Sequence, residues 1–162
     1  MPCEHIPARI TNDFGDYSAY EAAVYDAYLT TYSGKHFLFD GKPIYEKKHP
    51  LISGKSCTFW HIVSSGPDEA SKLPDFNRYE TVSWPGFILS HCVDNCESLL
   101  IWKNKRGSKS RILIYCQDID YLVVLDEREE FLLFWTSYPI TYNHTREKLL
   151  KEYKEYTEKQ SK

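Results

Sequence analysis

The chain has 162 residues, of which 42% are hydrophobic, 15% aromatic and 27% charged, and its formal net charge is −3. This composition excludes a disordered chain, and the length suits one domain that can bury a core without disulfides or metals. No segment approaches about 18 uninterrupted apolar residues, and the N-terminus lacks the basic and then apolar pattern of a leader. We therefore expect a cytoplasmic protein that does not enter a membrane.

The N-terminal part predicts an arm followed by a helix. Residues 1–16 are rich in Pro, Asn, Asp and Gly and are expected to form the arm, and residues 17–160 are expected to form one α+β domain. Ser18 and Glu21 have the Ser-x-x-Glu spacing of a capping box, apolar residues follow near helical period, and Gly34 can end the element. We expect an amphipathic helix here.

The middle of the chain is interrupted by glycines and prolines as far as Pro85. One stretch within it, SCTFWHIV at residues 56–63, is rich in aromatic and β-branched residues and is followed by SSGP. This pattern predicts a short strand.

The second half predicts a β-meander and a final helix. Four segments are rich in Leu, β-branched and aromatic residues and are separated by charged or turn-forming stretches: LLIWKNK, RILIYCQ, YLVVLDE and FLLFWTSY. Both faces of the middle strands are apolar, so a layer must cover each. The first helix can cover one face, and residues 144–160, with Leu149, Tyr153 and Tyr156 on one stripe, can cover part of the other. The expected fold is α+β, with an N-terminal helix, an antiparallel meander of four to five strands and a C-terminal helix.

The cysteines predict no crosslinks. Their number, five, is odd, and Cys57 and Cys116 lie in apolar runs where a free thiol packs as a small hydrophobe. The one metal-like spacing is HCVDNC, with His91, Cys92 and Cys96, but a structural zinc site normally takes two ligands from each of two segments. We therefore expect no metal and no cofactor.

A basic hairpin stands out in this acidic chain. Five cations fall within nine residues that contain no acid: Lys103, Lys105, Arg106, Lys109 and Arg111. They fit a solvated turn, whose charges oppose edge-to-edge pairing, or a surface for a phosphate backbone, where binding releases counterions. Strand alternation places Arg111 on the same face as Leu113 and Tyr115, where an arginine can hold a fixed position against a phosphate.

Histidines and hydroxyls supply two further candidate groups. His61 lies beside Trp60 in the predicted strand, and His49 lies in KKHP; either fits a general acid or base as well as a packed histidine. The last strand of the meander ends in three hydroxyl residues, with Thr136 and Tyr138 on one face and Ser137 on the other.

These groups suit the cleavage of RNA by its own 2′-hydroxyl, which needs no metal. A base removes the 2′ proton, a cation or hydroxyl stabilises the charged phosphorane, and an acid protonates the leaving 5′ oxygen. A His, an Arg and a Thr or Tyr hydroxyl can fill these roles.

The order of these parts resembles the barnase, EndoU, colicin and RelE-like ribonuclease superfamily, over roughly residues 17–158. The shared features are a helix, a His-bearing strand, a four-strand meander with Lys and Arg on an early hairpin, and a last strand ending in WTSY. The segments KKHPLISGKSCTFWHI, IWKNKRGSKSRILIY and YLVVLDEREEFLLFWTSYPI are similar to the phage-borne branch, which holds predicted toxin-type ribonucleases.

This resemblance implies a metal-independent endoribonuclease of toxin type, with RNA as substrate and an antitoxin or immunity protein as a partner. It matches the catalytic histidine to His61, or second to His49, the cation to Arg111 or else Arg106, and the hydroxyl to Thr136 with help from Tyr138. The residues that would hold flanking RNA are Lys48, Lys103, Lys105, Arg106 and Lys109. The same parts also fit a catalytically inactive RNA-binding or protein-interaction module, in which the hairpin docks an acidic partner.

Overall fold

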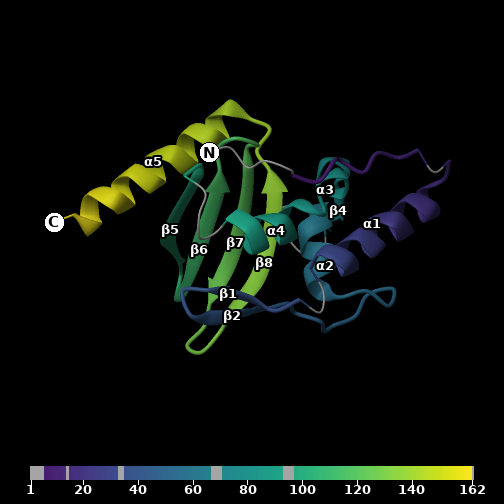
Figure 1. The fold of residues 1–162 in the computed structure, drawn as a ribbon, viewed down its shortest axis with the longest axis horizontal. Coiled ribbons are helices and arrows are strands. Elements are labelled where there is room, and N and C mark those ends of the chain that lie inside the picture. The colour runs from purple at the N-terminus through teal and green to yellow at the C-terminus, as the bar shows by residue number, and fades with distance from the viewer. Residues whose placement is uncertain (1–5, 14, 33–34, 67–70, 93–96, 162) are drawn as a thin grey trace.

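The computed structural model describes residues 6–13, 15–32, 35–66, 71–92 and 97–161, without the side chains of 91, 92 and 106 (Figure 1). The elements are α1 (Tyr17–Thr31), β1 (Phe37–Phe39), β2 (Lys42–Tyr45), α2 (Cys57–Val63), β3 (Ser64–Ser65), β4 (Leu73–Pro74), α3 (Phe76–Glu80), α4 (Trp84–Phe87), the π-helix η2 (Ile88–Cys92), β5 (Leu99–Arg106), β6 (Lys109–Cys116), β7 (Tyr121–Glu127), β8 (Leu132–Pro139) and α5 (Asn143–Gln160).

The fold is α+β and is built on a mixed sheet of six strands in the order β1-β2-β8-β7-β6-β5. Strands β5 to β8 pair antiparallel in sequence order, so the predicted meander is confirmed. The hairpin of β1 and β2 extends it, with β2 parallel to β8. The sheet curls, since Phe39 and Asp40 at the hairpin line a cavity together with Ile101 and Lys103 of β5, the opposite edge strand. Strands β3 and β4 form a separate two-stranded sheet.

Helix α1 forms where the sequence predicts a helix, but with a different cap. Asp16 has extended backbone angles, and its carboxylate accepts a hydrogen bond of 2.8 Å from the backbone N–H of Ala19. Asp16 is therefore the N-cap, and the predicted capping box at Ser18 is wrong. Tyr20, Val24 and Tyr28 are buried at a spacing of four residues, which turns one face of the helix toward the core.

The predicted strand at residues 56–63 is wrong, because Cys57–Val63 is helix α2. Ser56 caps it, with its hydroxyl accepting from the backbone N–H of Phe59, and the N–H of Cys57 donates to the carbonyl of Lys48. These bonds satisfy donors at the start of a helix that otherwise lack partners. Tertiary burial thus overrides the β-propensity of the side chains, six of which are buried.

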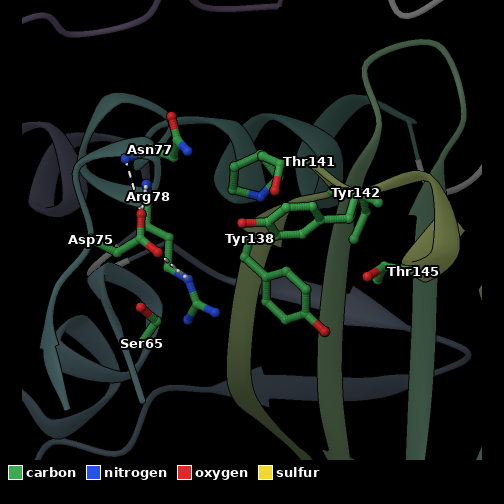
Figure 2. A pocket seen from close by; sticks show the side chains of 10 residues that line it. Ser65, Asp75, Asn77, Arg78, Tyr138, Thr141, Tyr142 and Thr145 are labelled. Atoms are coloured by element: carbon green, nitrogen blue, oxygen red, sulfur yellow. Dashed lines mark hydrogen bonds and ion pairs between the residues drawn. The ribbon is translucent and has the colours of Figure 1, made fainter.

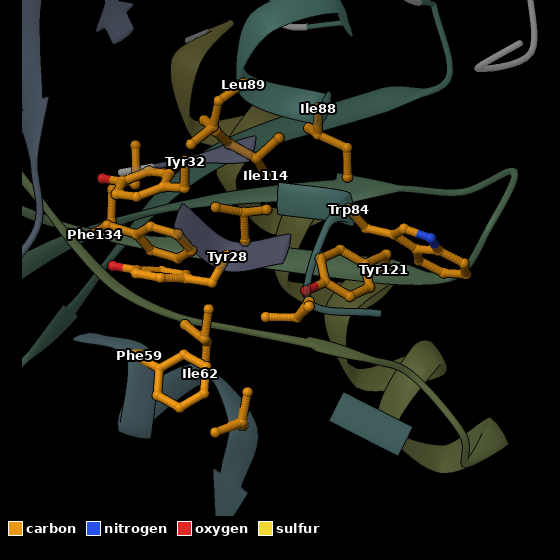
Figure 3. Packing of buried hydrophobic residues seen from close by; sticks show 14 of the residues in the cluster. Tyr28, Tyr32, Phe59, Ile62, Trp84, Ile88, Leu89, Ile114, Tyr121 and Phe134 are labelled. Carbon is orange, nitrogen blue, oxygen red and sulfur yellow. The ribbon is translucent and has the colours of Figure 1, made fainter. Parts of the chain in front are cut away.

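The first face of the sheet carries the larger core. Side chains of β6, β7 and β8 meet those of α1, α2 and α4 there, as Figure 3 shows for Tyr28, Phe59, Trp84, Ile114 and Phe134. The described part of the predicted arm, residues 6–13 and 15–16, has no helix or strand. It lies against this body: the indole of Trp84 donates to the carbonyl of Pro7, and Ile6 and Ile10 pack on the core.

Helix α5 covers part of the second face. Its Leu149 joins a core of Trp102, Leu113, Leu122 and Val124, among others, and Tyr153 and Tyr156 pack beside it. This arrangement confirms that both faces of the sheet are covered, and Figure 1 shows α5 lying across the end of β5 and β6. No helix among the described residues is long and apolar enough to cross a membrane.

Polar contacts fix the start and the middle of α5 on the sheet. Glu152 accepts hydrogen bonds from the indole of Trp102 at 2.7 Å and from the amide of Asn104 at 2.8 Å. At the start of the helix, the guanidinium of Arg146 contacts both carboxylate oxygens of Asp120, at 2.8 and 2.7 Å. This bidentate geometry is the strong form of the arginine–carboxylate pair.

We predict that Leu149→Ala destabilises the protein by about 2–3 kcal/mol, because Leu149 is 8% exposed and its removal leaves a cavity under α5. The matched control is its neighbour Leu150, which is 36% exposed and whose change to Ala should cost about 0.5 kcal/mol or less. Urea unfolding measures both values. Equal losses in the two variants would contradict the packing of α5 on the sheet.

A second prediction concerns acid stability. The hydrogen bond from Arg146, and after it the one from Tyr115, lowers the pKa of Asp120. The ionised form stabilises the fold above the unfolded-state pKa of about 4, and this contribution is lost as the pH falls through the lower folded-state pKa. We expect Asp120→Asn to be less stable than the native chain at pH 7, with a difference that shrinks as the pH falls below about 4. A pH-independent difference in urea unfolding would show that the pair does not stabilise the fold through charge.

Candidate functional site

A β-bulge in β8 shapes the second face of the sheet. Val124 of β7 pairs with Thr136, whereas the next residue, Leu125, pairs with Phe134, so Trp135 has no partner in the register. Phe134 points into the larger core, while Trp135 packs on the α5 side and Thr136 lines a cavity there. A bulge re-aims side chains, and this one places two consecutive residues on one face.

Beyond the bulge the alternation agrees with the sequence. Tyr138 lines the same cavity as Thr136, and the hydroxyl of Ser137 accepts a hydrogen bond of 2.8 Å from Tyr121 within the opposite face. The predicted faces of all three hydroxyl residues are therefore correct.

Trp135 lies at the centre of a cluster of charged and titratable side chains. The guanidinium carbon of Arg111 lies 4.9 Å and the Nζ of Lys109 5.6 Å from its ring. The ring of His61, from α2, lies 4.9 Å from it. Cations over an indole are attracted to its negative face, so the indole fixes where Arg111 stands. We call His61, Lys109, Arg111, Trp135 and Thr136 the Trp135 cluster.

Thr136 joins the cluster to α2 through the backbone. Its hydroxyl donates a hydrogen bond of 2.9 Å to the carbonyl of His61. The same carbonyl lies 3.5 Å from Nη1 of Arg78, which also donates to the carbonyl of Ser64 at 2.7 Å. The end of α2 is thereby held against β8.

Four of the five predicted catalytic residues, all but His49, line two cavities. The first, which we call the Arg111 cavity, has a volume of about 150 Å³. It is lined by Asn104, Arg111, Leu113, Leu122, Val124, Thr136, Tyr138, Thr145, Lys148, Leu149 and Glu152. The second, of about 220 Å³, is lined by His61 together with Cys57, Trp60 and Lys72, among others. His61 is 7% exposed, and its Nε2 lies 3.7 Å from the sulfur of Cys57. Trp135 contacts His61 from one cavity and Arg111 from the other, so its ring lies between these two side chains.

The basic hairpin divides its charges between the two faces of the sheet. Lys109 and Arg111 face α5 over Trp135. Lys103 and Lys105 alternate with Trp102 and Asn104, which contact α5, and so project to the other face. The backbone of Arg106 ends β5, and its side chain lies outside the described residues. The site thus receives only part of the positive charge that the sequence concentrates here.

Lys103 is paired within the protein. Its Nζ lies 2.8 Å from a carboxylate oxygen of Glu127, and this hydrogen bond raises the pKa of Lys103 and lowers that of Glu127. Lys48 and His49 are exposed between β2 and α2, and neither lines the Arg111 cavity or the cavity of His61.

Several site residues have weak sequence signals. Glu152 lines the Arg111 cavity, and its spacing from Leu149, Tyr153 and Tyr156 places a carboxylate on the apolar stripe of α5, which is a readable anomaly. Lys148 and Asn104 also line the cavity, although nothing in the sequence distinguishes them from ordinary surface residues.

The described residues hold no group of three His, Cys, Asp or Glu side chains that could bind a metal ion. The side chains of His91 and Cys92, and all of Cys96, lie outside the described residues. Cys57 and Cys116 are buried free thiols.

Comparisons of the chain with protein-family models, with curated proteins and with solved structures found no match. The chemistry of the site is therefore argued from its own side chains. A small cavity with a fixed guanidinium, three hydroxyls and a carboxylate at its wall can bind an anion of phosphate type and exchange protons with it.

We predict that Thr136→Val destabilises the protein by about 1–2 kcal/mol, because the carbonyl of His61 loses its short hydrogen bond in a half-buried place. Thr136→Ser keeps the hydroxyl and serves as the control. Urea unfolding of the two variants measures the difference. A valine variant as stable as the serine variant would show that the tether between β8 and α2 contributes nothing.

Proposed function

We propose that the protein is a metal-independent endoribonuclease of toxin type that binds RNA on the α5 side of its sheet. The Arg111 cavity carries this proposal, because it combines a guanidinium fixed on a strand with three hydroxyls and a carboxylate. The proposal includes membership of the ribonuclease superfamily that the sequence resembles and a cytoplasmic location. It also includes an antitoxin or immunity protein that would cover this face.

Arg111 is the phosphate-binding group in this proposal. Its guanidinium is held over Trp135 and extends from a strand with both neighbours paired, so little reorganisation is needed when a phosphate enters. Lys109 on the same indole and Lys148 at the cavity wall add positive charge around the phosphate. An arginine matches two phosphate oxygens at once, which favours the trigonal-bipyramidal phosphorane as its charge develops.

Two of the cavity's hydroxyls, those of Thr136 and Tyr138, have different roles. Because Thr136 gives its proton to the carbonyl of His61, its oxygen is left as an acceptor, which suits it to orient the 2′-hydroxyl of the ribose. Tyr138, from the same wall, can donate to a non-bridging phosphate oxygen.

Two side chains can transfer the protons. In the reaction the 2′ oxygen loses its proton and attacks phosphorus, the bond from phosphorus to the 5′ oxygen breaks, and that oxygen takes up a proton, leaving a 2′,3′-cyclic phosphate. Glu152 lines the Arg111 cavity and can accept the first proton. His61, across Trp135, is the candidate donor to the leaving oxygen.

The burial of His61 favours a second candidate function. Its ring is 7% exposed and its Nε2 faces Cys57, so the described state holds it as a packed histidine. An RNA-binding or protein-interaction module of the same fold would use Arg111 and Lys109 for affinity and would have no chemistry.

The test is cleavage of mixed cellular RNA in excess EDTA, with mapping of the ends. We expect the native protein to leave cyclic or 3′ phosphates and Arg111→Ala to lower the rate about 10²- to 10³-fold. Arg9→Ala is the matched control, since Arg9 lies 5.0 Å from the ring of Trp84 on the opposite side of the sheet and should leave the rate unchanged.

The proton-transfer groups are tested in the same assay. Glu152→Gln keeps an acceptor for Trp102 and Asn104 but removes the base, and His61→Asn removes the acid, so each should lower the rate about 10²-fold or more. Full activity of both folded variants would contradict the assigned roles. The binding module would be established instead if the native chain bound RNA in a salt-sensitive way without cleaving it and Arg111→Ala weakened that binding.

A further inference from the structure

A third cavity, lined by polar side chains, adjoins the Arg111 cavity and has a volume of about 340 Å³ (Figure 2). Asp75, Asn77 and Arg78 at the start of α3 form one side, and Tyr138, Tyr142 and Thr145 from β8 and the start of α5 form the other. Tyr138 and Thr145 also line the Arg111 cavity, so the two spaces share a wall. A molecule bound in one can extend into the other.

The one arginine of this cavity is committed to the protein. Arg78 donates to the carbonyl of Ser64, lies 3.7 Å from a carboxylate oxygen of Asp75, and stacks 4.6 Å from the ring of Tyr138. Its charge is thus balanced inside the wall by the carboxylate of Asp75. The cavity is therefore poorly suited to a phosphate.

The remaining polar groups are neutral. Asn77 offers an amide, and Ser65, Thr141 and Thr145 offer hydroxyls, all of which can donate and accept hydrogen bonds. Tyr142 is 65% exposed, makes no side-chain cap for α5, and stacks on His144 with ring centroids 5.5 Å apart. Neutral amides and hydroxyls beside an exposed aromatic ring are the groups by which proteins recognise unpaired bases of RNA.

We propose that this cavity binds an unpaired base of RNA whose adjoining phosphate lies at Arg111. The inference rests on the proposed function and deepens it: the substrate is single-stranded RNA, and Tyr142 supplies stacking while Asn77 distinguishes among bases. Tyr138 separates the base from the phosphate and contacts both. A base-paired nucleotide cannot present its edge to this cavity, so a duplex is excluded.

Binding without cleavage tests this inference. Fluorescence anisotropy would measure the affinity of the protein for 2′-O-methylated oligoadenylate, oligocytidylate and oligouridylate, which cannot react. The affinity for a matched duplex would be measured in the same way. We expect the native chain to prefer one single strand over the others and over the duplex. Tyr142→Ala should weaken single-strand binding about 5-fold or more, since stacking contributes about 1–3 kcal/mol per base. Tyr45→Ala, an exposed tyrosine on β2, is the control and should change nothing.

The remaining variants separate this inference from the proposed function. Asn77→Ala should reduce the difference in affinity among the three strands, whereas Arg111→Ala should weaken all of them alike. The base site would be overturned if the folded variants Tyr142→Ala and Asn77→Ala both kept the native affinity and the native preference among strands. If Arg111→Ala still lost binding in the same experiment, the phosphate site would stand. No binding of any strand by the native chain would overturn both.

Discussion

Burial of the central strands on both faces is the constraint on which the rest of the structure depends. The side chains of β6 from Ile112 to Cys116 and those of β7 from Tyr121 to Asp126 are all buried. Such strands need a layer on each side, and helices α1, α2 and α4 supply one while α5 supplies the other. Helix α5 packs over β5 and α3 packs against β8, and the side chains between these two helices leave an opening on the α5 side of the sheet. The Arg111 cavity and its neighbour occupy this opening.

The bulge at Trp135 determines what that opening contains. In a regular strand Trp135 and Thr136 would face opposite sides, and the indole would be lost from the site or the hydroxyl from the cavity. With the bulge, one indole meets Arg111 from β6 and His61 from α2, which are far apart in the sequence. The local positive charge of the hairpin is then divided, since among its described side chains Lys109 and Arg111 lie on this face while Lys103 and Lys105 project to the other. Salt dependence of any RNA affinity should therefore follow Lys109 and Arg111.

Local periodicity was sufficient to predict the meander, the stripe of α5 and the faces of Arg111, Thr136 and Tyr138, because each depends on neighbouring residues only. The β1–β2 hairpin also has a local signal, the Asp40-Gly41 turn, both of whose residues have positive φ. Other features depend on distant partners. The pairing of β2 with β8 joins Ile44 to Leu132, and helix α2 forms because tertiary contacts outweigh the β-propensity of its side chains. No sequence pattern predicts the contact between Arg78 and Tyr138, because this contact forms only when α3 packs against β8.

The central claim is that RNA lies on the α5 side of the sheet, against Trp135. The most direct measurement is a titration of the ¹⁵N-labelled protein with an uncleavable 2′-O-methylated single strand, following the four indole N–H resonances by NMR. Trp84 reports on the opposite face, where its N–H is bonded to the carbonyl of Pro7. The structure predicts that the Trp135 resonance moves with added RNA while that of Trp84 does not. Movement of the Trp84 resonance with Trp135 unchanged would contradict it.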